Sequence, residues 1–193
     1  DADVYATVGD DATVRVWSIS LKKVLRQAKI KCGGRALAFS PDGADIAVGM
    51  GYSVGTGDQK LSGAWCVLDA ESLEEKASGQ ESKEWISDVK YSPDGAQLAI
   101  GSHDNKVYLY TVEEGKYTYK GIKCEAHNSY ITHFDYTADG KFLRSTCGAY
   151  ELLFHSASNG AQDPSGASKL KDEAWASETC TLGWGVQGIW PEA

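Results

Sequence analysis

Asp88–Gly101, with the sequence DVKYSPDGAQLAIG, has two counterparts in the 193-residue chain, ALAFSPDGADIAVG at Ala36–Gly49 and HFDYTADGKFLRSTC at His133–Cys147. The central turn of each segment favours a tight hairpin. Proline, present in two of the three turns, presets φ, and the glycine of all three accepts the left-handed conformation. The short apolar runs on either side suit strands that are covered on both faces. The sequence therefore predicts three similar β-hairpins, with turns at Ser40–Gly43, Ser92–Gly95 and Thr137–Gly140.

The spacing of these turns predicts a propeller. They begin 52 and 45 residues apart, and a period of about 40–45 residues is that of a propeller blade, so the longer interval indicates an insertion. A second element recurs at Val8–Trp17 and Ile100–Tyr110, where an Asp-containing turn precedes an alternating strand that ends in an aromatic residue. Helical periodicity is not sustained anywhere, and we therefore expect an all-β fold of four-stranded antiparallel blades. Phe39 and Tyr91, which end the first strands of two units, are predicted to be mostly buried.

These units resemble the WD40 family, and the resemblance implies a propeller segment of about four blades that is incomplete on its own. Residues 1–34 are expected to form a partial blade, 35–85 a blade with an insertion, 86–130 and 131–182 two further blades, and 183–193 the first strand of the next blade. A seven-bladed ring would need roughly 300 residues at this period. The remainder of its own chain is therefore expected to close the propeller.

A narrower resemblance rests on three motifs: YSPDGAQLAIGSHDNKVYLY at Tyr91–Tyr110, HNSYITHFDYTADGKFL at His127–Leu143 and DEAWASETCTLGWGVQGIWPE at Asp172–Glu192. In this order they are similar to the echinoderm microtubule-associated protein-like family, over roughly Ser82–Glu192. The resemblance implies a non-catalytic scaffold that binds tubulin, microtubules or microtubule-associated proteins. It also implies a location in the cytoplasm on the cytoskeleton, with the ciliary axoneme as one form of it. The alternatives are a general WD40 adaptor for non-cytoskeletal complexes and, less favoured, a propeller enzyme.

Composition argues against several classes of function. The net charge of −8 is a poor match for a phosphate backbone, so nucleic acid is not expected as a partner. No apolar run approaches the ~20 residues that span a bilayer, and the acidic N-terminus does not resemble a signal peptide, so no membrane partner is expected. The five cysteines are scattered and none forms a CxxC pair, which predicts buried thiols in a reducing compartment rather than disulfides or a metal site.

The sequence also indicates no catalytic or cofactor site. WD40 resemblance implies a buried hydrogen-bonded set of His, Ser or Thr, Asp and Trp, of which this chain has parts: Asp11 and Trp17 in the first unit, Asp104 in the third and His127 in the fourth. We expect structural roles for these residues, because no nucleophile is visible beside a base. The glycine-rich stretch after Gly49 lacks the GxGxxG spacing and a following helix, which excludes a phosphate loop.

Six basic residues and no acidic ones lie between Leu21 and Ser40, and they are the candidate partner-binding residues: Lys22, Lys23, Arg26, Lys29, Lys31 and Arg35. Strand alternation places Arg26 on one face with Val24, Ala28 and Ile30, and Lys29 and Lys31 on the other. One interpretation is an exposed edge strand whose lysines prevent edge-to-edge aggregation. The other is a positive patch that faces an acidic partner such as tubulin.

Overall fold

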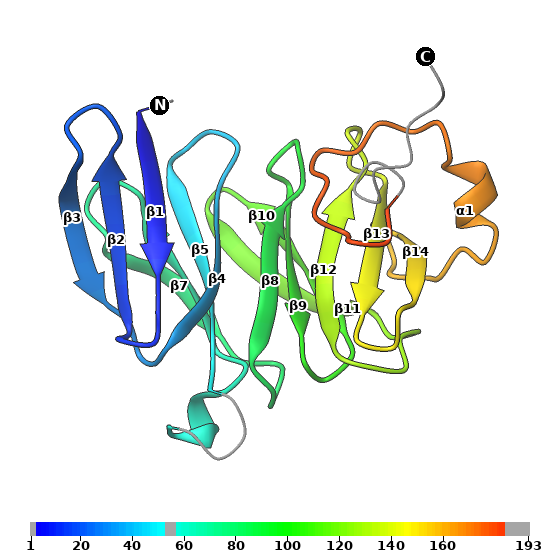
Figure 1. Ribbon diagram of the computed structural model, residues 1–193, viewed down its shortest axis with the longest axis horizontal. Helices are drawn as coiled ribbons and strands as arrows, with labels where there is room; N and C mark the ends of the chain where they lie inside the picture. Colours follow the sequence, from blue (N-terminus) through cyan, green and yellow to red (C-terminus); the bar gives the residue numbers. More distant parts are fainter. Residues whose placement is uncertain (1–2, 53–56, 184–193) are drawn as a thin grey trace.

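Four antiparallel sheets stand side by side in chain order in the computed structural model, which describes residues 3–52 and 57–183 (Figure 1). The first sheet contains β1 (Val4–Val8), β2 (Thr13–Ser18) and β3 (Lys23–Lys29). The second contains β4 (Gly34–Phe39), β5 (Asp45–Met50), β6 (Trp65–Asp69) and β7 (Glu75–Gly79). The third contains β8 (Ile86–Tyr91), β9 (Gln97–Ser102), β10 (Val107–Glu113) and β11 (Lys116–Cys124), and the fourth β12 (Ile131–Tyr136), β13 (Phe142–Cys147) and β14 (Leu152–Ser156). The predicted all-β arrangement is confirmed, and the described sheets do not close into a ring.

The three predicted hairpin turns share one geometry. Gly43 N–H donates to the carbonyl of Ser40 at 2.8 Å, and Gly43 adopts φ +75°. The Ser40 hydroxyl donates to Asp42 at 2.6 Å, and Asp42 in turn accepts from the Ala44 N–H at 3.1 Å. The same contacts recur in the turns that begin at Ser92 and Thr137. Local side-chain chemistry therefore determines these hairpins, as the sequence predicts.

Adjacent sheets pack closely where a glycine of one faces an isoleucine of the next. A Cβ atom at Gly49 of β5 would lie 2.2 Å from Cγ2 of Ile86 in β8. One blade further on, a Cβ atom at Gly101 of β9 would lie 2.9 Å from Cγ2 of Ile131 in β12. Both isoleucines are fully buried. The second strand of each of these two hairpins thus lacks a side chain where the first strand of the following blade must approach.

The fourth sheet departs from the prediction of a four-stranded blade. Among residues 3–52 and 57–183 it has three strands, and the chain after β14 forms the short helix α1 (Gly166–Lys169). The segment between them is rich in glycine, serine, asparagine and proline, which pair poorly in a ladder. It makes one isolated bridge to the sheet, between His155 and Gln162.

Burial of the strand ends also differs in part from the prediction. Tyr91 is buried as expected, whereas Phe39 is only half-buried. The reason lies in their neighbours: β8 stands between β4 and β12, while β4 faces the three-stranded first sheet, which has no counterpart of β4 among the described residues. All five cysteines are buried and unpaired, as predicted.

The insertion of the second blade follows β5. Its described part carries a single 3₁₀ turn, η1 (Gln59–Leu61), whose N-terminus is capped by the Asp58 side chain through a bond from Lys60 N–H at 3.0 Å. Residues 53–56 of the glycine-rich stretch and the expected strand at 184–193 lie outside the described residues. In the described part of the chain, no helix has the length and apolar character to cross a membrane.

Candidate interaction surface

Exposed basic side chains lie at both ends of β3 and in the turn that precedes it. The side chains of Lys22 and Lys23 are exposed and make no ion pair or hydrogen bond with any described residue. Along β3, exposed and half-buried residues alternate as the sequence predicts, which places Lys29 on the exposed face. Lys29 Nζ donates to the carbonyl of Asp11 at 2.9 Å and remains open to solvent. β3 pairs with β2 alone, so its other edge has no strand beside it among the described residues.

The other three basic residues of the stretch hold the first and second sheets together. Arg26 Nε donates to the carbonyl of Ala70 at 2.9 Å. Lys31 Nζ lies 3.2 Å from the Glu75 carboxylate. Arg35 is part of β4 rather than β3 and lies 2.9 Å from Asp10. The six residues therefore do not form one positive patch: Lys22, Lys23, Lys29 and Lys31 are exposed, and of these four only Lys22 and Lys23 have side chains without a partner among the described residues.

In the first sheet, the two residues proposed for the WD-type set do not contact each other. Asp11 lies in the turn between β1 and β2, where its carboxylate accepts from Thr13 N–H at 3.2 Å and from Arg15 at 2.6 Å. Trp17 Nε1 donates to the Thr7 hydroxyl at 2.9 Å, across the strand pair. Both residues therefore stabilise this hairpin, one at its turn and one along its strands.

The third sheet has a more complete set around Asp104. Ser82, which occupies the position of His127, donates to Asp104 at 3.0 Å and lies 2.7 Å from the Ser102 hydroxyl. Tyr108 donates to the same Asp104 oxygen at 2.5 Å. These contacts connect the loop before β8 to the turn between β9 and β10, so Asp104 joins a loop to the strands.

The fourth sheet holds the corresponding set around His127. Its Nε2 lies 2.7 Å from the Ser145 hydroxyl and its Nδ1 lies 3.4 Å from Glu151. Ser145 and Glu151 were not predicted from the sequence. The acidic residue, Glu151, lies at the end of the turn before β14 rather than at the position equivalent to Asp104. Serine, histidine and glutamate stand here in the order of a hydrolytic triad. However, Ser145 is 1% exposed, which leaves its hydroxyl without access for a substrate.

A stack of aromatic rings crosses from the second to the fourth sheet at the end of the strands opposite the predicted turns. The ring centroids of Trp85 and His103 lie 3.5 Å apart, and those of His103 and Tyr130 lie 4.4 Å apart. The guanidinium carbon of Arg35 also lies over the Trp85 ring, 5.5 Å from its centroid. Tyr130 is 43% exposed and presents a flat apolar surface to solvent. Nothing in the sequence points to this stack, since its members come from three separate loops.

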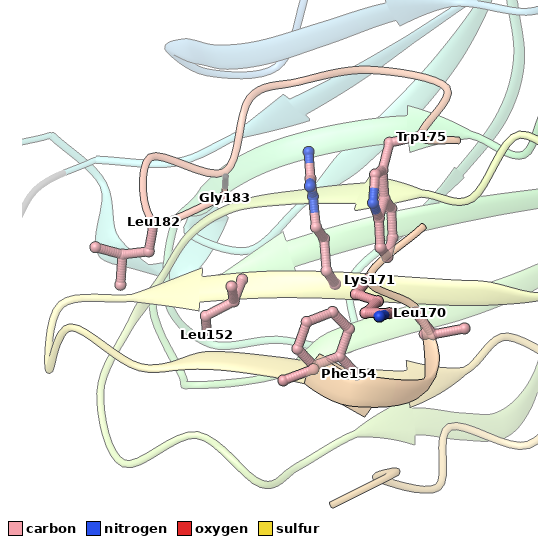
Figure 2. Close-up of a pocket in the computed structure, with 9 residues that line it drawn as sticks. Leu152, Phe154, Leu170, Lys171, Trp175, Leu182 and Gly183 are labelled. Carbon is pink, nitrogen blue, oxygen red and sulfur yellow. The ribbon is translucent and has the colours of Figure 1, made fainter. Parts of the chain in front are cut away.

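A pocket of roughly 260 Å³ lies beside β14 and α1. Figure 2 shows Leu152, Phe154 and Trp175 along its wall, and the Arg144 guanidinium lies 4.3 Å from the Trp175 ring centroid. Arg144 also pairs at 3.1 Å with the fully buried Asp135. Burial opposes ionisation of Asp135, but hydrogen bonds from Ser177, Cys180 and Thr179 lower its pKa to about 2. This charge pair fixes the segment after α1 against β12.

Comparison with known proteins gives consistent matches over the whole chain. A family model described as "Echinoderm microtubule-associated protein second beta-propeller" matches residues 1–193. Echinoderm microtubule-associated protein-like 2 of Rattus norvegicus is 38% identical over 189 residues, which cover 97% of this chain and 27% of that protein. The 77 kDa echinoderm microtubule-associated protein of Strongylocentrotus purpuratus is 38% identical over 190 residues, 98% of this chain and 26% of that protein.

A ciliary protein is similar to the same extent. The ciliary WD repeat-containing protein ctxp80 of Euplotoides octocarinatus is 36% identical over an alignment of 206 positions, gaps included, which covers 99% of this chain and 28% of that protein. The chain thus spans less than a third of the length of each of these relatives. Their names are those of microtubule-associated or WD-repeat proteins, and none of the three is the name of an enzyme.

Proposed function

The chain belongs to the echinoderm microtubule-associated protein-like family, and from this membership we propose that it is a non-catalytic propeller section of a microtubule-associated scaffold. The observation that carries the proposal is the family match over residues 1–193. The proposed location is the cytoskeleton of the cytoplasm, and the similarity to a ciliary WD-repeat protein supports axonemal microtubules as one such site.

Lys22, Lys23 and Lys29 are the proposed contacts with acidic tubulin surfaces. They are exposed in and just before the edge strand β3, and in the described part of the chain none of them has a hydrogen bond or ion pair to the neighbouring sheet, whereas Arg26, Lys31 and Arg35 each bind across between the two sheets. In a chain of net charge −8, these three lysines place positive charge along one strand edge, where it attracts an acidic partner. Each contact of this kind contributes only ~0.2–1 kcal/mol, so the three act together.

A structural role for the His127 set supports the non-catalytic part of the proposal. Ser145 and the His127 side chain are buried within the fourth sheet, and neither lines the pocket beside β14. A nucleophile without access to substrate performs no acyl transfer, whatever its hydrogen bonds. The third sheet has the same loop-to-strand contact with Ser82 in place of histidine. A structural contact can be made by either residue type, whereas a serine cannot replace histidine as a catalytic base.

Co-sedimentation of the intact protein with assembled microtubules tests the proposal. We expect the protein to pellet with microtubules at low ionic strength and to be released as salt rises, because exposed charges are screened over ~8–10 Å at physiological ionic strength. A protein that stays in the supernatant at every salt concentration, or that pellets independently of salt, would contradict a charge-based association.

The alternative is a general adaptor, and one observation favours it. The aromatic stack ends in Tyr130, whose exposed ring suits a protein partner of any origin. Loss of binding to a non-cytoskeletal partner in Tyr130→Ala, with unchanged microtubule co-sedimentation, would support this second role.

A further inference from the structure

Three different ligand atoms meet at the end of the fourth sheet. His127, Cys147 and Glu151 each offer one such atom, and the three atoms lie within 4.8 Å of one another. Cys147 Sγ lies 3.1 Å and His127 Nδ1 lies 3.4 Å from the same carboxylate oxygen of Glu151. These two separations from Glu151 are close to those between neighbouring ligands of one tetrahedral ion with bonds of about 2.0–2.3 Å.

We propose that His127, Cys147 and Glu151 form a binding site for a divalent ion of the zinc class. Imidazole nitrogen and thiolate sulfur select zinc and similar borderline ions, whereas calcium and magnesium require oxygen ligands. Three protein ligands leave a fourth position open for water. Glu151 lies on the solvent side of the site, since its side chain is 25% exposed and that of His127 is fully buried.

Neighbouring residues already orient these ligands. Ser145 lies 2.7 Å from His127 Nε2 and can accept the ring proton there, which leaves the lone pair of Nδ1 free for an ion. Asn128 holds the Glu151 carboxylate through its backbone N–H at 3.0 Å and its side-chain amide at 2.5 Å. These two bonds orient the carboxylate toward His127 and Cys147.

A second observation comes from His155 of β14. Its side chain is fully buried, and neither ring nitrogen has a hydrogen-bond partner among the described residues. Its ring centroid lies 6.1 Å from that of His127. The register pairs His155 with Leu143 and Ser145 with Leu153, so alternation places His155 and Ser145 on the same face of the sheet. A buried imidazole without a partner is costly, and a bound ion with its water would supply one nearby.

The proton balance of binding is simple. The Cys147 thiol releases its proton to solvent when the thiolate binds the ion, and the single proton of the neutral His127 ring shifts from Nδ1, where it is donated to Glu151, to Nε2, where Ser145 accepts it. Without an ion, the same atoms form hydrogen bonds from Cys147 and His127 to Glu151, and the experiment must separate these two states.

Metal content of the intact protein separates them. The protein is equilibrated with Zn²⁺, freed of excess ion by gel filtration and analysed for bound zinc per chain. Cys147→Ser and Glu151→Gln are compared with Cys66→Ser, a matched loss of a buried thiol in the second sheet. Glu151→Gln keeps an oxygen for Asn128 and lies partly in solvent, so it serves where Cys147→Ser does not fold.

We expect the wild type and Cys66→Ser to bind one equivalent more than either site variant. Substitution with Co²⁺ should give a thiolate-to-cobalt charge-transfer band that Cys147→Ser alone among the cysteine variants removes. Equal zinc content in all four proteins, with an unchanged cobalt spectrum, would overturn the proposal and leave a hydrogen-bonded network only.

Discussion

Arg26 Nε donates a hydrogen bond of 2.9 Å to the carbonyl oxygen of Ala70, and this bond joins the outer strand of the first sheet to the turn between β6 and β7 of the second. A residue that belongs to a basic stretch in the sequence is therefore a tie between blades in the structure. The distinction matters for function, because charge that is used to hold sheets together is not available to a partner.

Arg26→Gln should lower the free energy of unfolding by about 1–2 kcal/mol, because a buried carbonyl loses a charged donor. Lys22→Gln is the control, with no partner to lose and an expected change within about 0.5 kcal/mol. Denaturant titration followed by tryptophan fluorescence measures both. Equal effects of the two substitutions would mean that the Arg26 bond contributes nothing to stability.

Gly49→Ala should destabilise the fold by about 1–3 kcal/mol, since the new methyl group would overlap Ile86 in a packed interior. At Gly9 the nearest atom to an added Cβ is 3.7 Å away, so Gly9→Ala should be tolerated. The same titration compares them. If Gly49→Ala were as stable as Gly9→Ala, the two sheets would not pack as closely as described.

Asp135→Asn should cost about 3–5 kcal/mol, because it removes the buried partner of the Arg144 charge and leaves only the half-exposed Glu178. Glu178 also pairs with Arg144 but is half exposed, and Glu178→Gln should cost less than about 1 kcal/mol. A thermal melt of each variant gives the order. The reverse order would assign the main contact of Arg144 to Glu178.

Stability should fall as the pH is lowered from about 6.5 to 4. Burial lowers the pKa of His103 to about 4, and burial together with His127 lowers that of His155 to about 4. Both groups therefore take up protons in the unfolded chain before they do so in the folded protein, which favours unfolding throughout this range. His103→Phe keeps the ring stack and removes one titrating group, so it should flatten the dependence of the unfolding midpoint on pH. A slope identical to that of the wild type would show that His103 titrates normally.

Much of the fold could be predicted because its determinants are local. The turns at Ser40, Ser92 and Thr137 depend on contacts between residues two to five apart, which a short motif encodes fully. That the last sheet has three strands rather than four within residues 3–52 and 57–183 was not predictable from the period alone. The residues after β14 fill the length of a blade, but Pro164 and the glycines around it favour turns and a short helix.

The surface was harder to predict because its partners come from another blade. Arg26 meets Ala70, and Lys31 meets Glu75, in both cases across 44 residues, which is close to one repeat. Without these partners in view, the basic stretch suggests more unpaired positive charge than the structure has. Glu151 was missed for a related reason: its turn has a different acid position from that of Asp104, and only the folded loop brings it to His127.

The most direct measurement is salt-dependent co-sedimentation of the intact protein with microtubules after triple charge reversal at Lys22, Lys23 and Lys29. The matched control reverses Lys83, Lys116 and Lys120, which are also exposed, lie around the third sheet and change the net charge by the same amount. We expect a loss of binding for the first variant that shrinks as salt rises, with near-normal binding for the control. Equal binding by the two folded, soluble variants would contradict this expectation and leave the lysines of β3 as protection of a strand edge.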